Sequence, residues 1–442
     1  MAVADFDTAV IGGGVAGLAA ATALADAGAR VVVLEARGEL GGRATAFRDR
    51  VTGELVDNGQ HVLFGCYHET FRFLERIGAR DRVAVQRSLE VSYLDQEGRR
   101  SVLRCPPWPP PFHLLGGVFG WDAIPWREKF GALRLGADLR RDSRSHSDES
   151  VAQWLTRRGQ RGRIREWLWE PLAVAALNQA PDAAAAAPFI RVLQLMFRGR
   201  RDDASLVLPL RPLNEMYAQP ARQFIEARGG VVRVNALARV SVEKSAVAGI
   251  DVRGERLSAR QVIAAVPWFS LDALLTGDLA PMAGILDRAS RMASKPIVTV
   301  NLWYDRVVMD EAFVGLPGRR MQWVFDKRRA FGEGASHLSL VASGADALVG
   351  EETDRLIAMA AAEVGASIPG ARNATLLRGT VVREKRATFS VAPGQPPRPA
   401  VETPIAGVFL AGDWIDTGLP GTIESAAIAG HRAAQSALAN RQ

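Results

Sequence analysis

The chain opens with apolar runs separated by glycine-rich turns, and this pattern predicts a βαβ unit. Residues 8–11 are mostly apolar, residues 18–27 are helix formers, and residues 30–34 contain three valines in succession. Short apolar runs on either side of a helix are typical of buried parallel strands. We therefore expect a strand, a turn at 12–17, a helix and a second strand in this order.

Further segments of helical or strand period follow along the chain. They predict a helix at 69–77, mainly helical structure over 127–200, and helices at 354–364 and from about residue 422. Strands are predicted within 231–252 and at 261–267, 297–303 and 408–411. Strands that alternate with helices favour an α/β fold, into which the helical stretch is inserted as part of a second domain.

Residues 105–126 break this pattern. Here Cys105 is followed by three prolines around a tryptophan and more prolines up to Pro111, and two further tryptophans come at 121 and 126. So much proline excludes a regular core helix. Tryptophan rings beside cations suit a monotopic membrane contact over about 104–141, and a lid over the protein's own pocket is a compatible alternative. The flanking cations are Arg104, Arg127, Lys129, Arg134, Arg140 and Arg141.

The composition fits a globular protein with more than one core. The chain has 442 residues, of which 48% are hydrophobic, a formal net charge of +7, and two cysteines, Cys66 and Cys105. Two cysteines exclude a disulfide framework and fit a reducing cytosol, and the six histidines lack the spacing of metal ligands. A basic chain suits nucleic acid, an anionic membrane face or an acidic ligand. No nucleic-acid motif supports the first of these, so we expect no metal and no nucleic acid.

The apolar run at 9–25 has to be weighed as a secretory signal. Asp5 and Asp7 precede it where a signal carries Lys or Arg, and its glycines follow a pattern that a signal does not need. No run of about 20 apolar residues free of charge and proline is present, so no membrane-spanning helix is expected. We expect a cytoplasmic protein that lies on the inner face of the cytoplasmic membrane.

The glycine motif predicts a dinucleotide site. Gly12, Gly14 and Gly17 follow a strand and open a helix, so they permit a tight turn, close approach of backbone to a pyrophosphate, and close helix-to-strand packing. Glu35 ends the second strand about 20 residues further on, where a carboxylate accepts hydrogen bonds from ribose hydroxyls. A glycine turn with an incidental glutamate is the alternative.

Two further segments favour FAD over NAD as the dinucleotide. Gly42 and Arg43, after Glu35 and Ala36, form a second glycine loop with a cation for phosphates and the flavin edge. Near the other end of the chain, Gly412 and Asp413 follow the last predicted strand, where a carboxylate can bind the ribityl chain. Thr422 and Ile423 then begin a helix whose N-terminal dipole stabilises negative charge on the flavin. Two separated sites indicate FAD.

These segments resemble the flavoprotein superfamily of amine oxidases and phytoene desaturases. The segments that carry the likeness are 35–43 and 411–413, at the two ends of the chain. Residues 57–61, 177–178, 208–213 and 383–389 are similar to the squalene-associated branch, the hydroxysqualene dehydroxylases. This resemblance implies a Rossmann-like FAD-binding domain of that flavoprotein type with an inserted substrate domain of mixed sheet and helices.

The branch implies that hydroxysqualene loses its hydroxyl and receives hydride from reduced FAD, in bacterial squalene and hopanoid synthesis. A hydroxyl leaves poorly, so an acid must protonate it, and a dry apolar pocket must keep water from the allylic cation. We take as candidates His61, whose ordinary pKa suits proton donation, Asp57 to orient it, Tyr67 as a direct donor, and Arg386 to polarise the oxygen. A structural histidine bonded to backbone is the alternative for His61. We assign no position to the lysine that often holds a water near the flavin in amine oxidases.

The expected domains are discontinuous. Residues 1–85, 208–285 and 385–442 are assigned to the FAD-binding domain, and residues 86–207 and 286–384 to the substrate domain. Val240 completes the expected cofactor contacts. No second nicotinamide fingerprint is visible, so the electron donor stays unidentified. A carotenoid desaturase, an amine oxidase, and an isoprenoid-binding escort protein that keeps the fold without flavin chemistry are the alternatives.

Overall fold

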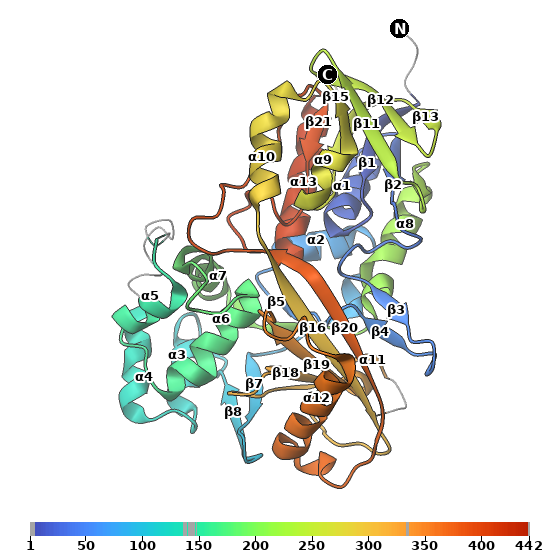
Figure 1. The fold of residues 1–442 in the computed structure, drawn as a ribbon. Helices are drawn as coiled ribbons and strands as arrows, with labels where there is room; N and C mark the ends of the chain where they lie inside the picture. The colour runs from blue at the N-terminus through green and yellow to red at the C-terminus, as the bar shows by residue number, and fades with distance from the viewer. Residues whose placement is uncertain (1–4, 136–138, 140–145, 147, 333–335, 441–442) are drawn as a thin grey trace.

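The computed structural model describes residues 5–135, 139, 146, 148–332 and 336–440. A parallel sheet with strand order β10-β2-β1-β14-β21 forms the upper part of the molecule in Figure 1. Its strands are β1 (Phe6–Ile11), β2 (Val31–Leu34), β10 (Val231–Arg233), β14 (Ala259–Ala264) and β21 (Val408–Leu410). The predicted βαβ start and the Rossmann-like α/β fold class are confirmed.

Two helices pack against each other beside this sheet. Helix α1 (Val15–Asp26) begins three residues before its predicted start, so Gly17 lies in its first turn. Helix α13 (Ile423–Ala439) crosses α1 at Gly430, where a side-chain Cβ would lie 2.2 Å from the carbonyl oxygen of Ala16. Helices α2 (His68–Arg76) and α8 (Gln219–Glu226) pack against this pair.

A second, mixed sheet lies below the first in Figure 1, with strand order β20-β16-β19-β18-β17-β7-β8. All its neighbouring strands are antiparallel except β7 and β17. The strands are β7 (Glu90–Leu94), β8 (Arg100–Arg104), β16 (Ser294–Tyr304), β17 (Phe313–Gly315), β18 (Trp323–Asp326), β19 (Ser336–Ser343) and β20 (Leu376–Phe389). Helix α12 (Thr353–Ser367) covers one face through Leu356, Ala360 and Val364, and α11 (Lys327–Phe331) follows β18.

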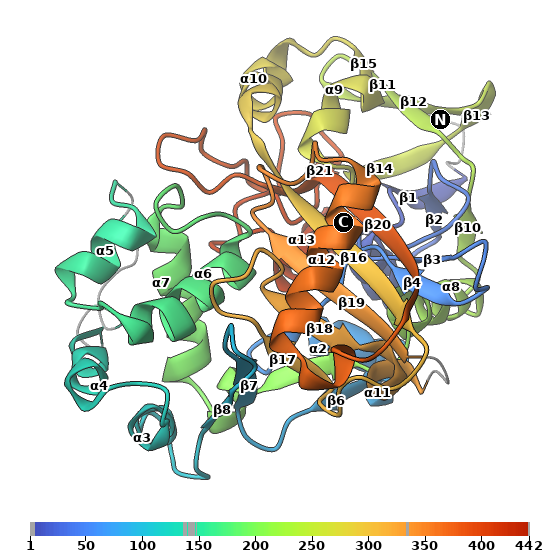
Figure 2. The same ribbon diagram turned by 60° about the horizontal axis from the view of Figure 1, so that its bottom comes forward.

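The remaining helices form a cluster beside the mixed sheet (Figure 2). They are α3 (Phe112–Gly120), α4 (Trp126–Leu133), α5 (Val151–Arg157), α6 (Glu170–Leu177) and α7 (Ala186–Arg198). Helix α3 was not predicted. The prolines up to Pro111 precede its first turn, where proline is tolerated because the first amides of a helix have no partner inside it. Within the described ranges, no helix combines the length and apolarity that crossing a membrane requires.

Among the described residues, three smaller sheets accompany the two large ones. They are the sheet β13-β12-β11-β15, the hairpin β3–β4 and the sheet β5-β9-β6. Their bounds are β3 (Ala46–Arg48), β4 (Leu55–Asp57), β5 (Leu63–Phe64), β6 (Val83–Val85), β9 (Leu206–Pro209), β11 (Ala238–Glu243), β12 (Ala246–Val252), β13 (Glu255–Leu257) and β15 (Leu275–Gly277), with α9 (Leu271–Leu274) and α10 (Ala283–Arg291). The domain bounds stay a prediction, and β20 passes through the one placed between residues 384 and 385.

Candidate functional site

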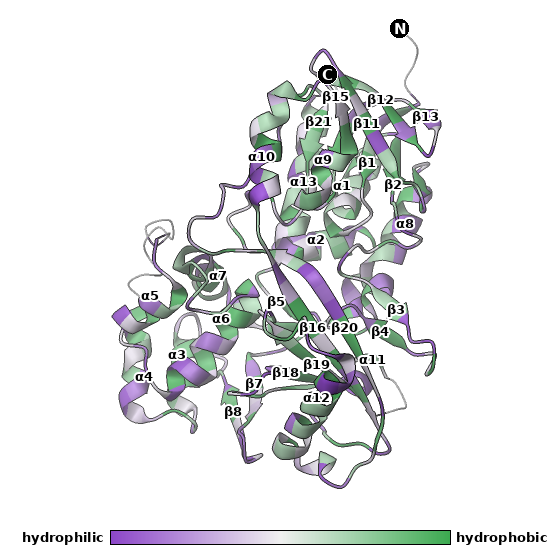
Figure 3. Ribbon diagram, in the orientation of Figure 1, coloured by the Kyte–Doolittle hydropathy of each residue, from purple (hydrophilic) through white to green (hydrophobic). Residues whose placement is uncertain are grey.

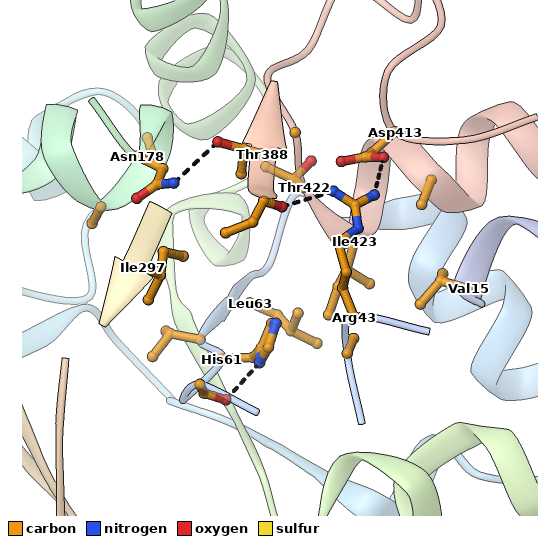
Figure 4. Close-up of a pocket in the computed structure, with 18 of the residues that line it drawn as sticks. Val15, Arg43, His61, Leu63, Asn178, Ile297, Thr388, Asp413, Thr422 and Ile423 are labelled. Atoms are coloured by element: carbon orange, nitrogen blue, oxygen red, sulfur yellow. Dashed lines mark hydrogen bonds and ion pairs between the residues drawn. The ribbon is translucent and has the colours of Figure 1, made fainter. Parts of the chain in front are cut away.

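A cavity of about 1050 Å³ runs from the parallel sheet to the helical cluster. One end is formed by the glycine turn after β1, Glu35 and the N-terminus of α13, and the other by apolar side chains of α3, α4 and α6. Figure 4 shows part of this wall, where residues from distant parts of the chain face one another. A chamber with one polar and one apolar end can hold a nucleotide cofactor next to a hydrocarbon.

The glycine turn presents bare backbone to the cavity. Gly12 has φ +111°, and a Cβ there would lie 2.3 Å from the carbonyl oxygen of Ala265. A Cβ on Gly17 would lie 1.9 Å from the carbonyl oxygen of Gly12, so only glycine lets α1 pack this closely on the turn. Gly12 and Gly14 line the cavity at the N-terminus of α1, where amides and helix dipole suit a pyrophosphate.

Glu35 lies at the end of β2 as predicted, and it lines the cavity. Its Oε2 accepts a hydrogen bond from the Gly13 amide at 2.7 Å, and its Oε1 accepts one from the Arg37 amide at 2.9 Å. These two bonds fix the carboxylate, and each oxygen keeps a further lone pair for a ribose hydroxyl. Ala36 lines the same part of the cavity.

Arg43 and Asp413 come from opposite ends of the chain and form an ion pair at the cavity wall (Figure 4). Arg43 Nη1 also donates to the Ala387 carbonyl oxygen at 2.7 Å. Gly42 and Gly412 line the cavity on either side of this pair. The two segments predicted to hold FAD therefore meet, although 370 residues separate them in sequence.

The N-terminus of α13 closes the polar end of the cavity. Thr422 caps this helix by accepting a hydrogen bond from the Ser425 amide at 3.1 Å, and both Thr422 and Ile423 line the cavity. Tyr67 lies beside them in the cavity wall. Burial raises the pKa of Tyr67, so its phenol is a hydrogen-bond donor and a very weak acid.

His61 lines the cavity, and its surroundings revise the role predicted for it. Its Nδ1 lies 3.0 Å from the Gly59 carbonyl oxygen (Figure 4). A carbonyl only accepts, so the proton of the neutral ring is on Nδ1 and Nε2 is an acceptor. Burial lowers the pKa of His61 more than the nearby Asp57 raises it. A neutral ring does not supply a proton, so the ordinary pKa assumed for His61 does not apply.

Asp57 does not reach the cavity. Its Oδ1 accepts from the Leu213 amide at 3.1 Å, and its Oδ2 pairs with Lys327 Nζ at 2.8 Å. Lys327 Nζ also donates to Gln60 Oε1 at 2.8 Å, and both members of the ion pair are almost fully buried. Asp57 therefore fixes the segment that carries His61 instead of bonding its ring. No local pattern predicts the role of Lys327, because its partner lies 270 residues away in the sequence.

Arg386 and Val240 also lie outside the cavity wall. The Arg386 guanidinium lies over the Phe269 ring at 4.1 Å on the exposed side of β20. Val240 is fully buried in the core of the small sheet, and Ala236, Leu237 and Ala238 line the cavity in its place. Val240 lies on the same face of β11 as Ala238, one step further along the strand than the cavity reaches. In β20 the register shifts between the pairs Ile297–Glu384 and Lys295–Thr388, so the alternation that places Val382 and Glu384 in the wall does not continue to Arg386.

Glu384 and Asn58 are cavity residues that the sequence reasoning missed. Asn58 Nδ2 donates to the Arg43 carbonyl oxygen at 3.0 Å and to Glu384 Oε2 at 3.1 Å. Both residues line the cavity, and Glu384 pairs across the strands with Ile297. They fall inside segments 57–61 and 383–389, which carry the family resemblance. The resemblance therefore marked the right segments, but we selected their neighbours Asp57, His61 and Arg386 as the candidates.

The apolar arm of the cavity is formed by side chains of the mixed sheet and the helical cluster. They include Val91, Tyr93, Leu114, Val118, Leu168, Leu172, Phe313 and Phe325. All five lysines of the chain are described, and none of them lines the cavity. Lys295 pairs with Asp346 at 3.2 Å, and Lys327 pairs with Asp57. The lysine that the amine oxidases led us to look for has no counterpart in the wall.

Residues 15–438 match the family described as flavin containing amine oxidoreductase. The chain belongs to this family. It is therefore an FAD-dependent oxidoreductase, and the glycine turn, the fixed Glu35 carboxylate and the Arg43–Asp413 pair suit the predicted cofactor. The reading as an escort protein without flavin chemistry is set aside.

Relatives that match this chain over almost its whole length include hydroxysqualene dehydroxylases and carotenoid desaturases. The chain is 29% identical to the hydroxysqualene dehydroxylase of Rhodopseudomonas palustris over 97% of this chain and 98% of that protein. It is 26% identical to the 15-cis-phytoene desaturase of Synechococcus elongatus over 98% and 96% of the two chains. Among solved structures, cyclohexylamine oxidase from Brevibacterium oxydans matches with a TM-score of 0.74 at 17% identity over 99% of each chain. The last likeness concerns the fold alone.

Proposed function

We propose that this protein reduces hydroxysqualene to squalene with hydride from bound reduced FAD. The observation that carries the proposal is the single cavity, which joins the glycine turn to an arm walled by leucine, valine and aromatic side chains. Such an arm suits a long hydrocarbon and offers little to a small charged amine. The hydroxysqualene dehydroxylases among the full-length relatives support the same substrate.

The chain's own residues divide the work of binding. Gly12, Gly14 and the start of α1 would hold the pyrophosphate, Glu35 would hold a ribose, and Arg43 with Asp413 would hold the middle of the cofactor. Reduced FAD, when bound, would supply the hydride. Thr422 and Ile423 would hold the flavin at the N-terminus of α13. The leucines and aromatics of the apolar arm keep water from the substrate carbon.

We also propose that α3 and α4 contact a membrane and that the substrate enters the cavity from the lipid along this helix pair. Trp108, Phe112, Trp126, Phe130 and Leu133 are large apolar side chains exposed by 47 to 65% on this helix pair. Leu133 also lines the cavity, as do Leu114 and Leu115 on the other side of α3. The helix pair therefore has exposed aromatic rings on its outer side and cavity-lining leucines on its inner side. This arrangement suits the passage of a hydrocarbon from lipid into the apolar arm of the cavity.

Two of the cations that we predicted to meet anionic lipid at this surface are engaged within the protein. Lys129 is buried, donates to the Phe119 carbonyl oxygen at 2.8 Å and lies 4.6 Å from the Trp126 ring. Arg104 pairs with Glu90 at 2.7 Å. Arg127 and Arg134 are exposed, whereas Arg140 and Arg141 lie outside the described residues.

Liposome flotation tests the membrane proposal. The variant Trp126→Ser with Phe130→Ser should lose most binding to anionic vesicles and keep bound flavin, because both rings are exposed. Val307→Ser with Leu377→Ser is the matched control, since these side chains are 50 and 66% exposed elsewhere. Equal flotation of both variants and the wild type would contradict this access route.

An anaerobic single turnover tests the reaction. The yellow, oxidised protein is first reduced and then mixed with hydroxysqualene, flavin reoxidation is followed, and the mixture is extracted. Reoxidation with one squalene per flavin is the expected result. Failure to reoxidise, together with bleaching of the oxidised protein by a polyene, would favour the phytoene desaturase reading, which the relative from Synechococcus elongatus supports.

A further inference from the structure

The proposed reaction needs a proton as well as a hydride. When the carbon–oxygen bond of the alcohol breaks, the departing oxygen must be protonated to leave as water. His61 does not fit this task, because its Nδ1 proton is held by Gly59 and its Nε2 is an acceptor. Burial raises the pKa of Tyr67, so its phenol is too weak an acid. A different group must therefore donate the proton.

Among the described residues, three carboxyl groups line the cavity: Glu35, Asp413 and Glu384. The first is fixed by the Gly13 and Arg37 amides, and the second is paired with Arg43. Glu384 belongs to the hydrophilic stretch of β20 that is coloured purple in Figure 3, and its side chain turns to the cavity. It alone of the three belongs to the mixed sheet that walls the apolar arm.

The position of Glu384 suits contact with both the cofactor end and the substrate. Asn58 Nδ2 holds its Oε2 at 3.1 Å, and the same Nδ2 donates to the Arg43 carbonyl oxygen at 3.0 Å. Ile297, its partner across the strands, lines the cavity, as does Thr299 two residues further along β16. Oε1 lies 3.4 Å from the Arg386 amide, a distance too long for a strong hydrogen bond, so it can turn to a ligand.

From this geometry we infer that Glu384 is the catalytic acid of the proposed reaction, and this inference rests on the proposed function. The carbon–oxygen bond breaks, the oxygen takes the proton of Glu384 and leaves as water, and the carbon accepts the hydride of reduced FAD. The carbon is reduced, the flavin is oxidised, and Glu384 regains a proton from solvent.

The test compares two leaving groups in the FAD-loaded, reduced protein. Glu384→Gln keeps an oxygen for Asn58 and removes the proton, so flavin reoxidation by hydroxysqualene should slow about 10²- to 10⁴-fold. The acetate ester of the same alcohol leaves without needing that proton, and with it the variant should match the wild type. Asp305→Asn is the control, because this carboxylate lies at the far end of β16 and bonds Arg306 and the Thr375 amide.

The outcomes separate the two proposals. A Gln variant as fast as wild type with the alcohol, or equally slow with alcohol and ester, overturns the role of Glu384 and leaves the proposed function standing. A wild-type protein that turns over neither compound overturns both. Retention of the flavin spectrum in the variant shows that the site is still assembled.

Discussion

Single polar residues hold the end of the hairpin β3–β4 to the mixed sheet at the cavity. Lys327, which begins α11 directly after β18, meets Asp57 from the end of β4, and Glu384 from β20 meets Asn58. The Asp57–Lys327 pair lies almost fully out of water, where a charge is tolerated only beside its partner. These contacts fix segment 57–61, so they determine where His61 faces the cofactor end.

Lys327→Met should therefore leave the Asp57 carboxylate buried without its counter-charge. We expect a loss of about 3–5 kcal/mol in stability, seen as a lower urea midpoint of the FAD-loaded protein. Arg291→Met is the control, because its pair with Asp287 is 61 and 60% exposed and such pairs contribute about 0–1 kcal/mol. Equal midpoints for the two variants would show that the buried pair adds no more stability than the exposed one.

At this scale the sequence predicts which residues approach the cofactor but not what they do there. The glycines, Glu35, Arg43, Asp413 and Thr422 follow from strand ends and helix starts, which are local features. Three features depend on contacts between segments that are far apart in sequence. They are the position of the proton on His61, the partner of Asp57 and the direction in which the Glu384 side chain points. No local pattern contains that information.

Among the elements, α1 and α13 form the closest contact of the cofactor-binding part. They approach at Gly430 and Ala16, and the glycine turn lies directly before α1. The element predictions hold where apolar residues dominate the segment, as in α1, α12 and β16. They missed α3, which follows a run of prolines. They also missed β20, because its four successive charged residues 383–386 lack the apolar alternation of a strand. That stretch is a strand because its neighbour β16 supplies hydrogen bonds and apolar cover.

Gly430→Ala should force these two helices apart. The new Cβ would lie 2.2 Å from the Ala16 carbonyl oxygen, so we expect a loss of about 1–3 kcal/mol and weaker FAD retention. Gly365→Ala in α12 is the matched control, because nothing lies within 4 Å of its Cβ. That change should be neutral or stabilise by about 0.5–1 kcal/mol. Thermal unfolding and flavin release measure both, and identical behaviour would contradict the packing argument.

The hairpin β3–β4 adds a contact that depends on pH. Burial favours a raised pKa for Asp49, but hydrogen bonds from Arg378 and the Thr52 and Val51 amides outweigh it and lower the pKa to about 2. Arg378 Nη2 lies 2.7 Å from Asp49 Oδ2. The unfolded chain binds this proton near pH 3.9, so the stabilisation is complete above about pH 4 and is lost as the pH falls towards 2.

Asp49→Asn should therefore lower the melting temperature at pH 6 and approach the wild-type value near pH 2. Melting temperatures of the two proteins from pH 6 down to the lowest pH at which both fold measure this. A difference that stays constant over the whole range would show that the carboxylate charge contributes nothing.

At the scale of the whole molecule, the cavity lies where the two sheets meet. Glu35 and the glycine turn belong to the parallel sheet, whereas Thr299, Val382 and Glu384 belong to the mixed sheet, and all of them face one cavity. A ligand that binds only the folded chain stabilises it by mass action, by about 2.7 kcal/mol at 100 times its Kd. FAD should therefore raise the stability of both parts together.

This linkage gives a direct measure of the ribose contact. Glu35→Gln loses the charge that accepts from the ribose, a bond worth about 1.5–3 kcal/mol, so FAD should bind roughly 10- to 100-fold more weakly. The curve of melting temperature against FAD concentration should then shift to higher FAD concentrations by that factor. The melting temperature of the variant without FAD should change less than its melting temperature with FAD. Glu39→Gln, an exposed neighbour outside the cavity wall, should follow the wild-type curve. Coincident curves for all three proteins would mean that Glu35 serves the Gly13 and Arg37 amides alone, and that the nucleotide is held by the glycine turn and the Arg43–Asp413 pair.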